Sequence, residues 1–82
     1  MTSNKIIRAI LEEQHLTQTA LGARVGMTCN RIADRLLSVN MNIKSFVQLL
    51  HAMDYKLVAV PRDARMPKGA YEVEIGKASE EE

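Results

Sequence analysis

A group of basic side chains between residues 17 and 45 is the part of this sequence best suited to bind a ligand. The stretch holds four basic residues, Arg24, Arg31, Arg35 and Lys44. Its only acidic residue is Asp34. A local excess of positive charge of this kind suits a polyanion. The alternative is that these residues form an ordinary solvated surface, and charge alone leaves both interpretations open.

Enzymatic and metal-binding chemistry has no comparable group of residues. Cys29 is the only cysteine, and neither His15 nor His51 stands at zinc-ligand spacing from it. Glu12 and Glu13 are adjacent and face different directions, so they do not form a catalytic carboxylate pair. Neither a nucleophile–base pair nor a phosphate-binding loop is visible. We therefore expect no catalytic residue, no metal, no cofactor and a protein that is not an enzyme.

The composition is that of one small globular domain. Of the 82 residues, 46% are hydrophobic and 26% charged, so a packed core is expected. With no Trp, one Phe and two Tyr, the core must be aliphatic, which argues against an RNA-binding sheet built on stacking aromatics. No apolar run is long enough to cross a bilayer and no signal-like block is present, so we expect a cytoplasmic protein.

Four segments with helical spacing of apolar residues must position the basic group. The predicted helices cover about residues 4–15, 18–24, 29–37 and 43–53. Ser3 or Asn4, then Thr17, Thr28 and Asn42, are their predicted N-caps. Gly26 stands where the second helix is expected to end in a positive-φ turn. The fourth helix has the broadest apolar face, formed by Ile43, Phe46, Val47, Leu49, Leu50 and Met53.

The pattern changes from helical to alternating after residue 54. Residues 55–60 are predicted to form a strand that Pro61 ends, and residues 71–75 a second strand, joined to it through a turn at residues 67–69. A lone apolar strand is unfavourable unless something covers it. The predicted dimer interface is therefore Tyr55, Leu57, Val58, Ala59 and Val60. The alternative is a hairpin within one chain, with Val73 and Ile75 on its second strand, and two such hairpins could also join.

The last six residues, 77–82, hold three glutamates and one lysine, and we expect them to form a disordered acidic tail. Without them, 10 basic side chains face 7 acidic ones. The predicted organisation is thus a helical domain over residues 1–54, a strand or hairpin over residues 55–76 that forms the dimerisation element, and the tail.

The segment Leu16-Thr-Gln-Thr-Ala-Leu-Gly-Ala-Arg-Val-Gly-Met-Thr28, followed by Ile32, Asn42-Ile43 and residues 46–53, resembles the Cro and phage-repressor (XRE-type) helix-turn-helix family. Gly22, Leu36 and Ser38 depart from the alanine, glutamate and glycine usual in that family. The resemblance implies a mainly α, lambda-repressor-like helix-turn-helix domain of four or five helices. It also implies binding of operator DNA as a homodimer.

The resemblance assigns roles to individual residues. It places Gln18 beside a phosphate at the start of the second helix, and Cys29, Asn30 and Asp34 on the face that contacts bases. An amide can pair with adenine, and a carboxylate can accept from the amino group of cytosine. Further expected DNA contacts are Thr17, Thr28, Arg31, Arg35, Asn40, Asn42 and Lys44. The alternative for Asn30 and Asp34 is that both are merely solvated helix positions.

The sequence thus leads to three functional hypotheses. The first is a homodimeric transcriptional repressor that reads an inverted-repeat operator in double-stranded DNA. The second is an antitoxin that represses its own operon and also binds a toxin protein, which predicts a neighbouring toxin gene. The third is a helical protein-interaction module that does not bind DNA, and the basic residues around positions 24–44 argue against it.

Overall fold

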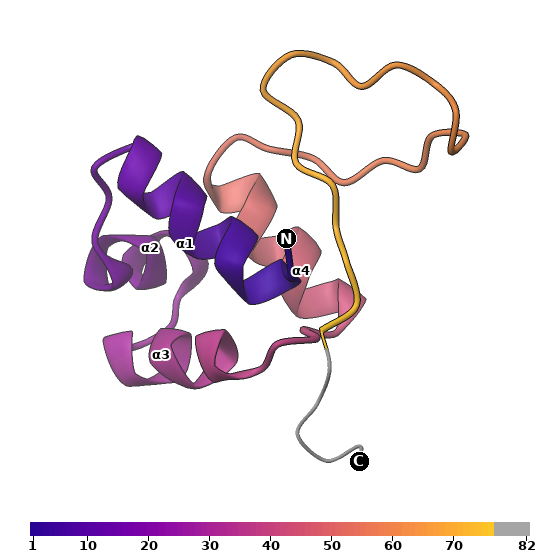
Figure 1. The fold of residues 1–82 in the computed structure, drawn as a ribbon. Coiled ribbons are helices and arrows are strands. Elements are labelled where there is room, and N and C mark those ends of the chain that lie inside the picture. The colour runs from indigo at the N-terminus through magenta and orange to yellow at the C-terminus, as the bar shows by residue number, and fades with distance from the viewer. Residues whose placement is uncertain (77–82) are drawn as a thin grey trace.

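Four short helices form one compact, mainly helical unit in the computed structural model, which describes residues 1–76 (Figure 1). They are α1 (Ser3–Glu13), α2 (Gln18–Val25), α3 (Cys29–Leu37) and α4 (Ile43–Ala52). All four predicted helices are confirmed, and so is the mainly helical character of the described residues. The predicted acidic tail, residues 77–82, lies outside the described residues.

Each helix contributes a stripe of aliphatic side chains to a shared core. The fully buried members include Ile6, Ile7, Ile10, Leu21, Ile32, Leu36, Leu49 and Met53. The broad apolar face predicted for α4 is correct for Phe46, Leu49 and Leu50 but wrong for Ile43, whose side chain is 67% exposed. Ile43 begins α4, where it lies at the wall of an apolar groove instead of in the core.

The start of α1 is tied to the loop between α3 and α4. The buried hydroxyl of Ser3 donates to the Val39 carbonyl (3.1 Å) and accepts from the Met41 amide (2.9 Å). The Asn4 side chain donates to the Leu36 carbonyl (3.1 Å). Neither residue is therefore the N-cap that the sequence predicted: Thr2 holds that position, while Ser3 hydrogen-bonds to the loop and Asn4 to the end of α3.

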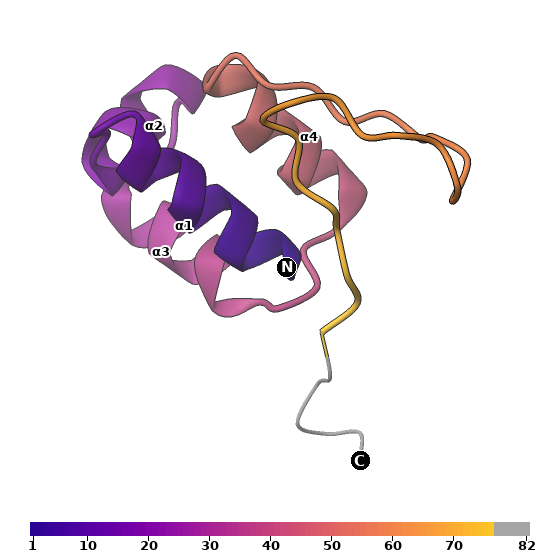
Figure 2. The same ribbon diagram turned by 45° about the horizontal axis from the view of Figure 1, so that its top comes forward.

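Residues 55–76 form an extended arm that leaves the helices, turns and comes back along α1 and α4 (Figures 1 and 2). The turn expected at residues 67–69 is present: the Ala70 amide donates to the Pro67 carbonyl (3.1 Å), and Gly69 has a φ of +85°. Gly69 tolerates this left-handed conformation because it has no Cβ.

The two predicted strands, however, do not form among residues 1–76. Segments 55–60 and 71–75 do not pair with each other, and both line one apolar groove. A strand requires a neighbour for its backbone groups, and here the single β-bridge joins Thr2 to Glu74. The hairpin alternative is thus wrong for the single chain.

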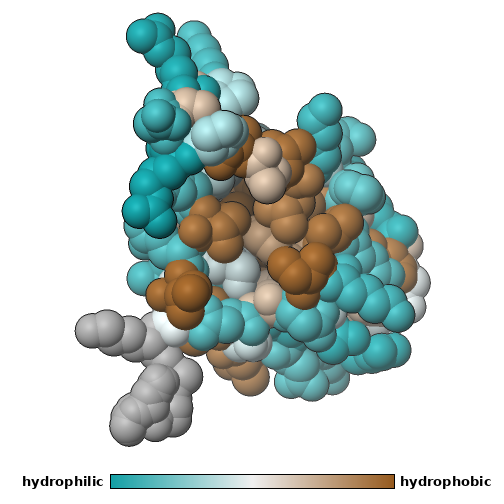
Figure 3. Space-filling model, turned by 90° about the vertical axis from the view of Figure 1, so that its right-hand side faces the viewer, coloured by the Kyte–Doolittle hydropathy of each residue, from teal (hydrophilic) through white to brown (hydrophobic). Residues whose placement is uncertain are grey.

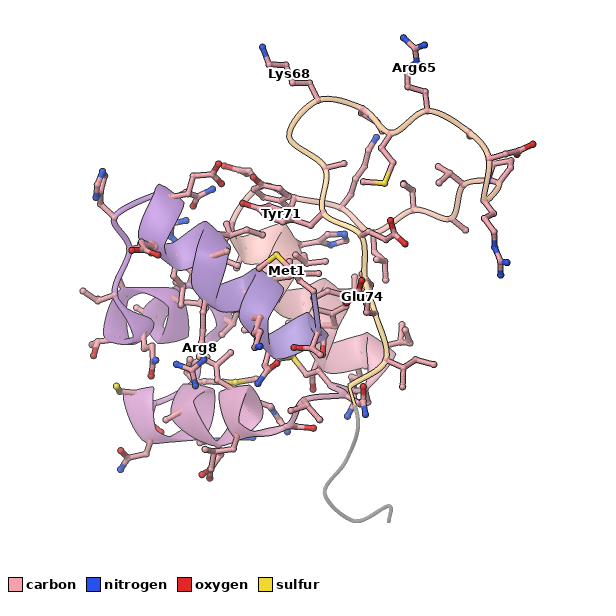
Figure 4. All side chains as sticks on the ribbon, in the orientation of Figure 1. Met1, Arg8, Arg65, Lys68, Tyr71 and Glu74 are labelled. Atoms are coloured by element: carbon pink, nitrogen blue, oxygen red, sulfur yellow. The ribbon has the colours of Figure 1, made fainter. Side chains whose placement is uncertain are left out.

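Side-chain contacts hold the two ends of the arm to the helices. The ring centroids of Tyr55 and Tyr71 are 6.3 Å apart, and the Tyr55 hydroxyl donates to a Glu13 carboxylate oxygen (2.9 Å). Glu74 lies beside Met1 (Figure 4), where its amide donates to the Met1 carbonyl (2.8 Å) and its carboxylate contacts the amino group (3.1 Å). Between these ends, Arg65 and Lys68 project from the far part of the arm, away from the helices (Figure 4).

None of the helices within residues 1–76 has the length and apolar character needed to cross a membrane.

Candidate functional site

A tight corner at residues 26–28 connects α2 to α3 and fixes the position of the exposed face of α3. Gly26 has a φ of +74°, in the left-handed region, as its place after α2 predicted. The Met27 amide then donates back to the Gly22 carbonyl (2.8 Å). A Cβ at position 22 would collide with the Met27 carbonyl and would lie 3.3 Å from Cγ1 of Ile32. The close approach of turn and helix therefore requires the glycine.

Three of the predicted ligand contacts are helix caps. The hydroxyl of Thr17 accepts from the Ala20 amide (3.0 Å), and that of Thr28 accepts from the Arg31 amide (3.2 Å). The carboxamide oxygen of Asn42 accepts from the Ser45 amide (2.8 Å). The predicted caps of α2, α3 and α4 are thus confirmed. Each cap still has a donor group that none of these bonds uses, namely a hydroxyl hydrogen or an amide NH₂.

Helix α3 divides into a buried and an exposed face. Ile32 and Leu36 are completely buried. The predicted contact residues Cys29, Asn30, Arg31 and Asp34 are all exposed in the first turns of the helix. Asn30 and Asp34 are four residues apart and therefore neighbours on the helix surface. The structure thus places an amide and a carboxylate on the same face of α3, which does not pack against the core.

A polar hollow of about 420 Å³ lies beside this face, between α3, the corner and the start of α4. Three basic side chains line it, Arg31, Arg35 and Lys44, and Asn42 stands at its edge. Its described lining contains no acidic residue. The hollow is thus a local concentration of positive charge. We call it the basic hollow.

Arg35 contributes an unusual feature to the basic hollow. Its Nε atom is buried and has no hydrogen-bond partner among residues 1–76. A buried donor without a partner costs about 1–3 kcal/mol. Arg35, whose side chain lines the basic hollow, therefore carries one unsatisfied buried donor.

Sequence reasoning missed Gln48, which also lines the basic hollow. A signal was present, because Gln48 follows Lys44 by four residues and so shares its face of α4.

Two polar residues from the same stretch are engaged elsewhere. Asn40, a predicted DNA contact, pairs with the backbone of Gly76 through both amide atoms, at 2.8 and 2.7 Å. Arg24, part of the basic group, donates to the Ala52 carbonyl (2.9 Å) near the end of α4. Gln18 is partly buried at the start of α2. The structure therefore separates Asn40 and Arg24 from the residues around the basic hollow.

Comparison with known proteins gives no match to a family model, a curated protein or a solved structure. The geometry of α3 and the basic hollow must therefore carry the functional argument.

Proposed function

We propose that the chain is a sequence-specific DNA-binding transcriptional regulator, in which α2, the corner at residues 26–28 and α3 act as a helix-turn-helix unit. The observation that carries this proposal is the basic hollow, whose lining within residues 1–76 has no acidic side chain, directly beside the exposed first turns of α3. A helix inserted into the major groove needs both features, a face for base edges and flanking positive charge for phosphates.

The two parts of the site take different roles in this proposal. Asn30 is the side chain assigned to a base edge, because its carboxamide can donate and accept toward adenine at once. Arg31, Arg35 and Lys44 are assigned to the backbone, where a phosphate in the basic hollow would supply oxygen acceptors to the guanidinium groups. Asp34 beside Asn30 would repel phosphates and suits a cytosine amino group.

Repression of transcription from an inverted repeat requires two copies of the chain. A two-fold axis would place two α3 helices about one DNA turn, roughly 34 Å, apart. In that arrangement the protein would exclude polymerase from an operator, which is the homodimeric repressor that the sequence resemblance implied. The same DNA-binding face would serve an autoregulating antitoxin.

Selection from random duplexes, followed by titration of the selected site at two salt concentrations, tests the proposal. We expect an inverted repeat and a steep fall of affinity with salt. Asn30→Ala should lose about 1–3 kcal/mol of binding and relax the preference at one base position in each half-site. Failure to enrich any sequence, with weak binding even at low salt, would contradict the proposal.

A matched pair of lysine variants separates phosphate contact from general charge. Lys44→Gln, at the basic hollow, should weaken binding to all sequences and reduce the salt slope by about one. Lys5→Gln removes the same charge from the exposed surface of α1, outside the hollow, and should leave the slope unchanged. Equal effects of the two substitutions would count against a phosphate site at the hollow.

A further inference from the structure

Two hollows of opposite character meet at the loop between α3 and α4. The basic hollow includes Asn42 of this loop. The apolar groove between the arm and the helices, with a volume of about 1010 Å³, includes Asn40 and Met41. Figure 3 shows the apolar face around this groove. The charge of a segment beside the loop therefore decides which of the two hollows can accept it.

The returning end of the arm is fixed at this same loop. Asn40 hydrogen-bonds to the Gly76 backbone through both atoms of its carboxamide, at 2.8 and 2.7 Å. Asn40 lies outside the basic hollow, but it precedes Asn42, at the edge of the hollow, by only two residues. Two residues span at most about 7 Å. The two hydrogen bonds therefore hold Gly76 close to the edge of the basic hollow.

The acidic tail that follows Gly76 carries the opposite charge to the basic hollow. Residues 77–82 have the sequence Lys-Ala-Ser-Glu-Glu-Glu, so their three glutamates stand four to six residues after Gly76. A chain of that length spans at most about 13–22 Å. The hollow offers three basic side chains, Arg31, Arg35 and Lys44, and its described lining holds no acidic one. The number and the sign of the charges are thus complementary.

The apolar groove does not suit the same segment. Its described lining holds one basic side chain, Lys56, and two acidic ones, Glu72 and Glu74. A carboxylate that enters an apolar surface loses hydration without gaining a partner. On α1, the guanidinium of Arg8 already donates to the Leu36 carbonyl (3.4 Å). Charge therefore directs an acidic segment to the basic hollow.

We infer that, in the absence of DNA, the glutamates at positions 80–82 occupy the basic hollow of their own chain. Their carboxylates accept hydrogen bonds from Arg31, Arg35 and Lys44, in the places that phosphate oxygens take in the proposed function. The acidic tail is then a competitor of DNA that the chain itself carries, and an incoming duplex must displace it. Because the contact is intramolecular, the effective concentration of the tail at the hollow is of millimolar order.

The consequence of this contact for DNA binding rests on the proposed function, whereas the contact itself can be detected without DNA. A basic hollow that is occupied by the tail, in a protein that binds no duplex, would contradict only the proposed function. A protein that binds duplex DNA, but whose hollow is the same with and without the three glutamates, would contradict only the tail contact.

The first experiment detects the contact by NMR in the full chain without DNA. The tail variant combines Glu80→Gln, Glu81→Gln and Glu82→Gln. It should shift the amide signals of Lys44 and Gln48 and the Nε–H signals of Arg31 and Arg35, which line the hollow. Roughly 1 M salt screens exposed charges beyond about 3 Å, so it should move the wild-type signals toward those of the tail variant.

A charge-matched variant is the control. Glu12→Gln, Asp63→Asn and Glu72→Gln together remove the same charge from exposed positions outside the basic hollow. This control variant should leave the signals of the hollow in place.

The second experiment measures the competition by titration of the selected duplex at about 0.1 M salt. The tail variant should bind about three- to tenfold more tightly than the control variant, because its hollow does not have to be vacated. Comparison of these two variants removes the effect of net charge. The advantage should disappear when Lys44→Gln is added to both, and it should persist with Lys5→Gln, which lies outside the hollow.

Three outcomes would overturn the inference. The first is that replacement of the three glutamates leaves the signals of the hollow unchanged. The second is equal duplex affinity of the tail variant and the control variant, which would mean that the glutamates do not compete for the hollow. The third is an advantage that Lys44→Gln and Lys5→Gln reduce equally, which would mean that the tail acts through general charge.

Discussion

The helical part of the molecule, residues 1–54, and the arm, residues 55–76, differ in how they satisfy their backbone hydrogen bonds and where they place their apolar side chains. Each helix satisfies most of its backbone hydrogen bonds internally and buries one stripe of side chains in a shared core. The arm has the alternating pattern of strands, but residues 56–60 have no backbone partner within residues 1–76. The comparison teaches that a local pattern indicates where a helix forms, because the hydrogen bonds of a helix are internal, whereas a strand needs a neighbour for its hydrogen bonds.

The contrast extends to where the two regions keep their large apolar side chains. Residues 1–54 contain all the fully buried ones, such as Ile10 and Leu36. The arm instead exposes Val58, Val60 and Val73, and only Tyr55, Leu57 and Tyr71 pack against the core. Of the predicted dimer interface, Tyr55 and Leu57 are thus partly used within the chain.

The largest expected effect tests how strongly the helical part depends on its buried stripe. Leu36→Ala should lower the free energy of unfolding by about 2–5 kcal/mol, because it removes a completely buried side chain and leaves a cavity. The neighbouring Leu37 is 76% exposed, so Leu37→Ala should cost less than about 0.5 kcal/mol. Urea denaturation followed by circular dichroism measures both values. Similar losses for the two leucines would mean that α3 does not pack as described.

A smaller effect is expected where the arm is fastened to the helices. Asn40→Ala removes both hydrogen bonds to the Gly76 backbone and should cost about 1 kcal/mol. Hydrogen exchange should accelerate at the amides of Glu74 and Gly76, which hydrogen-bond to Met1 and Asn40 at the returning end of the arm, and stay constant in α1 to α4. Asn30→Ala is the control, because Asn30 is an exposed amide on α3 and far from the arm in sequence. Faster exchange throughout the helices would show that arm and helices open together.

The same contrast explains what the sequence could and could not predict. Caps at Thr17, Thr28 and Asn42 and the turn at Gly26 act within a few residues, so the helix boundaries followed from local chemistry. Ile43 was misplaced because helical spacing alone does not show that this first residue of α4 lies at the apolar groove instead of in the core. Asn40 was assigned to a ligand because nothing near it in sequence indicates that Gly76 occupies its amide.

For the candidate site, too, the sequence predicted the local features but not the arrangement of residues distant in sequence. Exposure of Asn30 and Asp34 followed from helical spacing around Ile32 and Leu36. The basic hollow could not be predicted from helical spacing, because its lining combines residues from the end of α2, from α3 and from the start of α4. Gln48 joins it only through that packing. A pattern thus identifies which side chains are free, and tertiary structure decides which of them act together.

The smallest effect concerns the base of the arm, where one hydrogen bond joins it to α1. The pKa of Tyr55 is raised above its ordinary 10.0, first by donation to Glu13 and further by partial burial and the nearby negative charge. A raised folded pKa stabilises the protein fully below pH 10.0, and this contribution disappears as pH rises through the folded value. Tyr55→Phe should therefore cost about 0.5–1 kcal/mol at pH 7, and the difference from wild type should shrink above pH 10.0 and vanish once pH exceeds the raised folded pKa. Thermal unfolding of both proteins between pH 7 and 11 measures it. A difference that persists at high pH would assign the effect of Tyr55 to its ring contact with Tyr71, and the hydrogen bond would then contribute little to holding the arm on α1.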